Sequence, residues 1–429
     1  MAAARAIQSG HFLSRIGYDV HSNVVQRCFA TGWATVGRCR CTVQNGRLLT
    51  TQASDAKKTP LYDFHLQHGG KIVPFAGWAL PIQYTGSGLV QEHLHTRQEC
   101  SLFDVSHMLQ LTFGNSGCVK FLESLIVTDV ANLPQGRGTL SVFTNENGGI
   151  IDDLIVSKIS DESISVVSNA ACSEKVVQHI QTKMNQFNSS SHQSVDVKVI
   201  TNRGLLALQG PKSAVVLQRL TNSNLSQIPF MGYTNSNIAD IDGCFIARGG
   251  YTGEDGFEIS VPSDYCAKLA QEFLKHPEVK LAGLGARDSL RLEAGLCLYG
   301  NDIDEETTPI EAGLAWTVGK ARRNTGNFPG SDTIIKQLQE GPSRKRVGLI
   351  STGPPARGGT KIFSSHDDEI GIITSGSPSP SLKKNIAMGY IKTAFCKIGT
   401  EVQLQVRNKK VNATIARMPF LPSNYYNVK

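Results

Sequence analysis

Residues 140–159 read LSVFTNENGGIIDDLIVSKI, and two apolar runs in this stretch flank the turn sequence Asn-Glu-Asn-Gly-Gly. Runs rich in β-branched and aromatic residues on either side of an Asn-Gly pair are typical of a β-hairpin. The sequence therefore predicts antiparallel strands that meet at residues 145–149. Two carboxylates, Asp152 and Asp153, lie within the second predicted strand, where ionised side chains are unusual.

A second hairpin is predicted further along the chain. Residues 244–248 and 257–261 flank the segment GGYTGEDG at 249–256, which is too rich in glycine to form anything but a turn. Between the strands, residues 173–186, 264–275 and 284–298 carry apolar side chains at three- and four-residue spacings, which predicts helices. Strands mixed with helices in this order indicate an α+β fold.

The last part of the chain has a different pattern. Residues 321–343 contain several Gly and Pro pairs and are predicted to be a linker. Short strand patterns follow at 347–351, 370–375, 386–391 and 401–406, so residues 344–429 are expected to form an all-β barrel or jelly-roll-like module.

Charge is concentrated at the start of the chain of 429 residues. Eight basic residues and two acidic ones up to residue 58 account for six of the seven net positive charges. The remainder is almost neutral, which argues against a nucleic-acid-binding domain. A segment rich in Arg, Ser and Ala and poor in acids is typical of a mitochondrial transit peptide, so residues 1–55 are expected to be a transit peptide and disordered lead that is cleaved between Arg40 and Lys58.

Other classes of protein lack support in the sequence. No apolar run approaches the roughly 20 residues of a membrane span, and the chain has no phosphate-binding loop, dinucleotide fingerprint or nucleophile elbow. The ten cysteines are scattered without a CxxC pair, so we expect neither disulfides nor a zinc site. His93 and His95 have no further ligand at a standard spacing, and we therefore expect no metal.

Three carboxylates are candidates for chemistry, although the residues alone leave each of them open. Side chains alternate across a strand, so Asp152 and Asp153 should face opposite ways and cannot both line one pocket. Either of them could instead cap the turn or pair with a basic residue. Glu258 alternates with apolar neighbours and could simply face water, whereas Glu254 and Asp255 are interpreted as turn residues.

Arg287 and Arg291 are four residues apart in a predicted helix and therefore project from one face. Arg291 also lies three residues from Asp288. A pair at that spacing is most often a surface ion pair, and this is the interpretation that the pattern favours.

Seven short motifs occur in order along the chain. They are TPLYDFHL (59–66), FAGW (75–78), FDVSHM (103–108), GIIDDLIV (149–156), GYTGEDG (250–256), ARDSLRLEAG (286–295) and MPF (418–420). Together they closely resemble the aminomethyltransferase (T-protein) family of the glycine cleavage system. The resemblance extends from about Thr59 to the C-terminus.

The resemblance implies a mitochondrial matrix enzyme that accepts an aminomethyl group from the lipoyl arm of the H-protein. It would release ammonia and form 5,10-methylenetetrahydrofolate from tetrahydrofolate, with the other glycine cleavage components as partners and with no metal, flavin or nicotinamide cofactor. The implied fold is a three-domain cloverleaf. Residues 59–320 would form two intertwined α+β domains that bind folate, and the predicted β module would be the third domain.

Site residues follow from the same resemblance, position by position. Asp153 matches the catalytic carboxylate, and Glu258 matches the residue that binds the pterin ring, whose adjacent N–H groups suit a carboxylate that accepts two hydrogen bonds. Arg287, expected to be fixed by neighbouring carboxylates, and Tyr425 match further substrate-binding positions. Met108, Asn169 and Tyr251 lie in matching segments and are expected to line the site.

Two related classes of protein were weighed against this assignment. Folate-binding iron–sulfur assembly factors, which are not catalytic, carry the motif Lys-Gly-Cys-Tyr-x-Gly-Gln, whereas this chain reads EAGLCLYGN at 293–301. The folate-dependent portions of dimethylglycine and sarcosine dehydrogenases accompany a flavin-binding domain, and this chain has neither the room nor the fingerprint for one.

Overall fold

The predicted hairpin of residues 140–159 is confirmed. The computed structural model describes residues 56–191 and 193–427, and in it β6 (Arg137–Thr144) pairs antiparallel with β7 (Ile150–Ser160). At the turn, the Asn145 side chain accepts hydrogen bonds from the backbone N–H groups of Asn147 and Gly149, both at 2.9 Å. Gly148 has a φ of +86°, a conformation that glycine adopts without steric cost.

β6 and β7 belong to a five-stranded sheet with the order β6-β7-β8-β5-β9. The other strands are β8 (Ser163–Ser168), β5 (Leu109–Gly114) and β9 (Asp196–Ile200). Helices α3 (Cys118–Glu123) and α4 (Ser173–Ser190) share a core with the sheet, in which Phe121 and Val176 pack with Leu154. The helix predicted at 173–186 is therefore present, and it is one turn longer.

The second predicted hairpin, β12 (Ile241–Arg248) with β13 (Gly256–Pro262), is also confirmed. It belongs to a six-stranded sheet with the order β11-β12-β13-β10-β4-β14. The remaining strands are β11 (Tyr233–Ile238), β10 (Arg203–Gln209), β4 (Cys100–Asp104) and β14 (Val279–Leu281). Helices α5 (Ser213–Gln218) and α6 (Cys266–Leu274) share this core, and so does Phe64 of α1 (Tyr62–Gln67). The helix predicted at 264–275 begins as a 3₁₀ turn at Ser263–Tyr265.

A small sheet carries the first described residues. Its order is β1-β3-β2, with β1 (Lys57–Lys58), β3 (Trp78–Tyr84) and β2 (Gly70–Phe75), and α1 (Tyr62–Gln67) packs on it. Helix α2 (Leu89–Gln98) follows and packs against α7 (Leu284–Glu293).

Further 3₁₀ turns lie at Ala170–Cys172, Leu225–Gln227, Ala315–Thr317 and Thr393–Phe395. Among the described residues, no helix is both long and apolar enough to cross a membrane.

One expectation about a helix boundary is wrong. The helix predicted at 284–298 ends at Glu293, because Gly295 turns into the left-handed region with a φ of +68° and ends the helix. The predicted linker at 321–343 contains α8 (Arg322–Thr325) and α9 (Ser331–Glu340). Phe328 and Ile334 in this segment are buried in a core that also contains Ile150, so it packs against the first hairpin.

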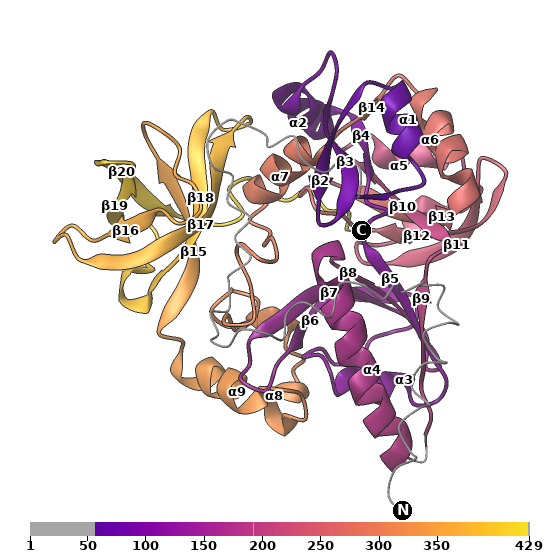
Figure 1. The fold of residues 1–429 in the computed structure, drawn as a ribbon, viewed down its shortest axis with the longest axis horizontal. Coiled ribbons are helices and arrows are strands. Elements are labelled where there is room, and N and C mark those ends of the chain that lie inside the picture. Colours follow the sequence, from indigo (N-terminus) through magenta and orange to yellow (C-terminus); the bar gives the residue numbers. More distant parts are fainter. Residues whose placement is uncertain (1–55, 192, 428–429) are drawn as a thin grey trace, which may run out of the picture. The chain divides into compact units, whose positions relative to one another are not determined.

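The C-terminal module is a closed barrel, as the strand pattern predicted. Its order is β15-β18-β17-β16-β19-β20. The strands are β15 (Arg344–Ser351), β16 (Lys361–Phe363), β17 (Glu369–Ser379), β18 (Lys384–Lys392), β19 (Glu401–Val406) and β20 (Lys409–Ala416). Helix α7 contacts β17 and β18 of the barrel as well as β3, and it links these parts of the fold (Figure 1).

A buried ion pair fastens α7 to the barrel, and it corrects the expectation for Arg291. Arg291 does contact Asp288, at 2.8 Å, but its side chain is only 2% exposed and its guanidinium also donates to Asp302 at 2.6 Å. The hydroxyl groups of Thr374 and Ser375 in β17 donate to the same Asp302 carboxylate. The sequence indicated a surface pair, whereas the structure has a buried network that includes the barrel.

Removing the cation of this network should destabilise the protein. Arg291→Met leaves Asp302 buried without its charged partner, and we expect the free energy of unfolding to fall by about 3–5 kcal/mol. Chemical denaturation followed by circular dichroism measures this change. Asp288→Asn, which removes the exposed partner of the same arginine, is the control and should cost less than about 1 kcal/mol. Equal losses in the two variants would contradict this interpretation.

Candidate active site

Asp153 and Asn169 lie together at the end of the five-stranded sheet. Asn169 follows β8 directly, and its side-chain amide donates to Asp153 Oδ1 at 2.7 Å. The same amide nitrogen donates to Asp152 Oδ1 at 2.9 Å. Burial alternates along β7 as predicted, with Asp152 fully buried and Asp153 partly exposed. The two carboxylates are nevertheless linked, because Asn169 reaches both of them.

Both aspartates have perturbed acidity. Burial raises the pKa of Asp153 to about 7, and the charge of Asp152 adds to this shift, while the hydrogen bond from Asn169 opposes it. Burial also raises the pKa of Asp152, although donors from Ser168 and Asn169 favour its ionised form. Asp153 can therefore exchange a proton near neutral pH, where a general acid or base is most effective.

Glu258 lies in β13. Its partners on the two adjacent strands are the small residues Ala207 and Ala247. Burial raises the pKa of Glu258, and the positive charge of Arg287 partly offsets this effect. Glu258 therefore does not simply face water.

Arg287, in the first turn of α7, was expected to be fixed by neighbouring carboxylates, but it has no ion pair with any carboxylate of residues 56–191 and 193–427. Its guanidinium lies over the ring of Tyr251, 4.7 Å from the ring centroid, and its buried Nη1 has no hydrogen-bond partner in the described part of the chain. Burial lowers the pKa of Arg287, and Glu258 and Tyr251 counteract the effect. A buried donor without a partner is costly, so this nitrogen is available to a ligand.

Tyr251 lies in the turn between β12 and β13, close both to Asp153 and to Arg287. Its hydroxyl donates to the Cys297 carbonyl, and both Asp153 and Arg287 are close enough to influence its pKa. Gln209 packs tightly against this turn, since a Cβ atom on Gly250 would lie 2.0 Å from its side-chain oxygen. Gln209 also donates to the Gly249 carbonyl at 2.9 Å.

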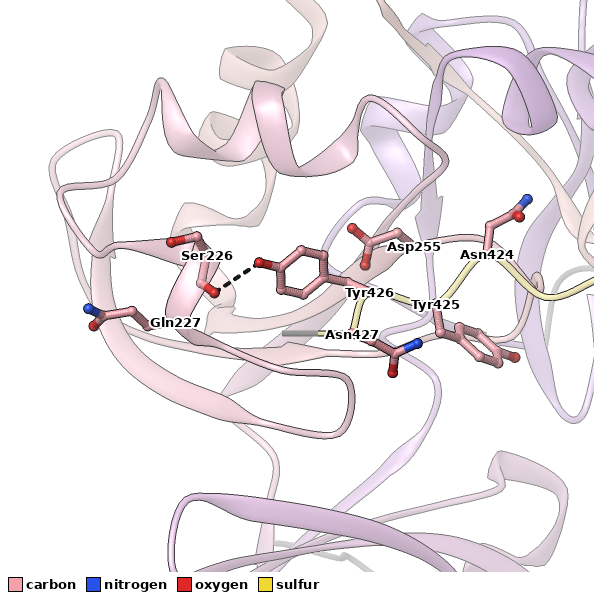
Figure 2. A pocket seen from close by; sticks show the side chains of 7 residues that line it. All are labelled: Ser226, Gln227, Asp255, Asn424, Tyr425, Tyr426 and Asn427. Carbon is pink, nitrogen blue, oxygen red and sulfur yellow. Dashed lines mark hydrogen bonds between the residues drawn. The ribbon is translucent and has the colours of Figure 1, made fainter. Parts of the chain in front are cut away.

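The remaining two candidates, Met108 and Tyr425, lie in different parts of the fold. Met108 packs at the edge of the apolar core that contains Ala207 and Ala286, which are neighbours of Glu258 and Arg287. Tyr425 stacks on Phe230, with ring centroids 4.2 Å apart, and lines a groove of about 610 Å³ at the C-terminal segment. Figure 2 shows this groove, in which the Tyr426 hydroxyl bonds the Ser226 carbonyl. Neither Asp153 nor Glu258 lines it.

The structure thus groups Asp153, Asn169, Tyr251, Arg287 and Glu258, whereas Tyr425 lines the groove at the C-terminal segment. An ionisable carboxyl with a pKa near 7, a second carboxylate and a guanidinium nitrogen that has no partner among the described residues together suit a polar, nitrogen-rich ligand that gains or loses protons.

Glu254 and Asp255 are more than turn residues, which corrects their interpretation. Glu254 is buried and binds Arg97 at 2.8 Å and the side-chain nitrogen of Asn424 at 2.9 Å. Asp255 pairs with Arg248 at 2.6 Å. These contacts fasten the turn that carries Tyr251. Sequence reasoning missed Gln209, Arg97 and Asn424 because no local pattern marks a partner that is distant in sequence.

No group of three or more metal-binding side chains occurs in the described ranges. His93 instead contacts Ser289 and Glu293, and the His95 ring contacts the carbonyls of Cys100 and Glu278.

Comparison with known proteins gives consistent matches. Family models described as "GCVT N-terminal domain" and "Glycine cleavage T-protein C-terminal barrel domain" match residues 61–322 and 344–421. The chain is 53% identical to the mitochondrial aminomethyltransferase of Homo sapiens over 373 residues, which cover 87% of this chain and 92% of that protein. It is 49% identical to that of Pisum sativum over 407 residues, with coverage of 94% and 93%.

A solved structure is also similar. The crystal structure of glycine cleavage system aminomethyltransferase T from Bartonella henselae superposes with a TM-score of 0.81 at 39% sequence identity. The match covers 86% of this chain and 99% of that one.

The raised pKa of Asp153 has a consequence for stability. Between about pH 4 and pH 7 the folded protein holds a proton that the unfolded chain has released, so stability from this group falls as the pH rises. We expect Asp153→Asn, which cannot ionise, to melt about 2–4 °C above the parent at pH 8 and to show a smaller difference at pH 5. Differential scanning calorimetry at the two pH values measures this.

The control for this measurement is Asp242→Asn, a change at an exposed position in β12. It should shift the melting temperature little, and equally at both pH values. An Asp153→Asn protein that melts below the parent at pH 8 would show that the charge of Asp153 does not destabilise the fold.

Proposed function

This chain belongs to the glycine cleavage T-protein family and is an aminomethyltransferase of that system, and from this premise we propose that its acceptor is tetrahydrofolate, held by Glu258 and activated by Asp153. The single observation that carries the proposal is the cluster itself. Arg287 lies over the ring of Tyr251, and it is close enough to Glu258 to affect the pKa of that carboxyl. Tyr251 is in turn close to Asp153, which has a pKa near 7 and lies 105 residues before Glu258 in the chain.

The proposed reaction transfers the methylene carbon of an aminomethyl group, carried on the lipoyl arm of the H-protein, to two folate nitrogens. Both nitrogens lose a proton as their bonds to carbon form. One proton leaves with the amine as ammonia, and the other goes to the lipoyl sulfur. A group that exchanges protons near neutral pH and can carry a negative charge suits this step, because charge develops on the cationic one-carbon unit as ammonia departs.

Glu258 is proposed to bind the pterin ring. An ionised carboxylate accepts hydrogen bonds from two adjacent N–H donors at once, and the small residues Ala207 and Ala247 leave room for a flat ring. Arg287 would supply its free Nη1 to the ligand, and Met108 and Asn169 would line the cavity. For Tyr425 we propose a further contact with the substrate at the rim.

We also propose that the chain works in the mitochondrial matrix with the H-protein and the other glycine cleavage components. The human and pea relatives are named as mitochondrial proteins. Residues 1–55, which lie outside the described residues, would act as the targeting segment. Residues 59–320 would bind the folate, and residues 344–429 would form a separate barrel domain connected through residues 321–343.

Replacing Asp153 by asparagine tests the catalytic assignment. Asp153→Asn keeps the shape of the side chain and removes its charge and its exchangeable proton, so we expect tetrahydrofolate binding within about threefold of the parent and a loss of turnover of roughly 100-fold or more. The measurements are folate affinity by calorimetry and ammonia release from aminomethylated H-protein. Turnover within a few-fold of the parent would refute the role of Asp153.

Replacing Glu258 tests the binding assignment separately. Glu258→Gln turns a double acceptor into a side chain with one acceptor and one donor group, and we expect tetrahydrofolate affinity to fall about 10- to 100-fold. Glu272→Gln in α6, a neutralising change outside the cluster, is the matched control. Unchanged affinity in the Glu258 variant would place the pterin elsewhere.

A further inference from the structure

Asp152 is a buried carboxylate that the proposed reaction does not use directly. It has no exposed surface, and three donors converge on it. These are the Ser168 hydroxyl, the backbone N–H of Asn169 at 2.9 Å and the side-chain amide of Asn169 at 2.9 Å. Three hydrogen bonds to the carboxylate favour its ionised form and offset part of the cost of burial, although burial still raises the pKa of Asp152.

The side-chain amide of Asn169 links Asp152 to Asp153 by hydrogen bonds. Its amide nitrogen donates to Asp152 Oδ1, to Asp153 Oδ1 at 2.7 Å and to the Asp153 carbonyl at 3.2 Å. The opposite orientation of the amide would bring its oxygen against two carboxylates, which is repulsive. The side chain of Asn169 is therefore held in one orientation, and it holds the Asp153 carboxyl in turn.

Few other groups near Asp153 carry a charge that could shift its pKa. The titratable neighbours are Cys172 and Tyr299 beside Asp152, and Tyr251 and Cys297 beside Asp153, and burial raises the pKa of all four, so they stay neutral at physiological pH. Lys175 is engaged by Glu305 and the Tyr299 hydroxyl. The charges of Arg287, Arg291 and Asp302 affect the pKa of Tyr251. Asp152 remains as the charged group that acts on Asp153.

We infer that Asp152 is a positioning residue for the reaction: its buried negative charge and its hold on Asn169 keep Asp153 in place and able to take up a proton at neutral pH. The two aspartates titrate as one unit, and the charge of Asp152 raises the pKa of Asp153. This inference rests on the proposed role of Asp153, and it assigns a function to the carboxylate that faces the core.

The pH profile of kcat/KM tests the inference. The parent should lose activity below an apparent pKa of about 7, because Asp153 becomes protonated there. Asp152→Asn removes the neighbouring charge and should move this acid limb down by at least about one pH unit. At pH 6 the variant would then keep a fraction of its plateau activity about fivefold larger than the parent does, whatever the plateau itself becomes.

Two further variants keep the test decisive if Asp152→Asn folds poorly. Asp152→Ser also removes the charge and should give the same downward shift. Leu154→Val, a change on the same buried face of β7 that loosens the core without altering charge, should leave the acid limb within about 0.3 pH unit of the parent, since it changes only packing.

The outcomes separate this inference from the proposed function. An acid limb that stays in place in both Asp152 variants, together with an inactive Asp153→Asn protein, overturns the inference and leaves the role of Asp153 intact. The same conclusion follows if Leu154→Val moves the limb as far as the Asp152 variants do. An active Asp153→Asn protein overturns both.

Discussion

The side-chain amide of Asn169, bonded to the carboxylates of Asp152 and Asp153, is the contact on which the organisation of this site depends. Burial removes solvation from the two adjacent carboxylates and raises both pKa values, and the charge of Asp152 adds to the shift of Asp153. The shared amide offsets part of that cost and gives the two groups different surroundings. Asp152 is buried and accepts three hydrogen bonds, whereas Asp153 is a partly exposed carboxyl that can change its protonation state near neutral pH.

Helix α7 connects this site with the rest of the fold. Arg287 in its first turn lies over Tyr251 with one donor free, whereas Arg291, one turn later, is committed to Asp302 and the barrel residue Ser375. The two arginines share a helix face, as the sequence predicted, but their contacts differ. Arg291 pairs with the carboxylate of Asp302, and Arg287 lies over the ring of Tyr251. A ligand that accepts a hydrogen bond from Arg287 Nη1 would offset the desolvation cost of that buried donor. Binding energy gained in this way can be directed to the reacting centre.

Local pattern predicted the elements that local chemistry specifies. Turn sequences at 145–149 and 249–256 fixed both hairpins, and strand spacing indicated the barrel. Contacts between distant residues were not readable. Arg291 meets Ser375 across 84 residues, and the Glu254–Arg97 pair spans 157, so surface pairing and turn roles were the natural but wrong interpretations. Asp153, Glu258 and Tyr425 came from family resemblance, since alternation along a strand could say only that Asp152 and Asp153 face apart.

The central claim is that Asp153 and Glu258 serve one ligand, and a crystal structure of the protein with tetrahydrofolate tests it most directly. The account predicts the pterin ring within hydrogen-bond distance of the Glu258 carboxylate, Arg287 Nη1 bonded to the ligand, and the folate nitrogens that receive the carbon facing Asp153. A folate bound only in the groove beside Tyr425 and Tyr426, with the carboxylates of Asp153 and Glu258 free of it, would contradict the account.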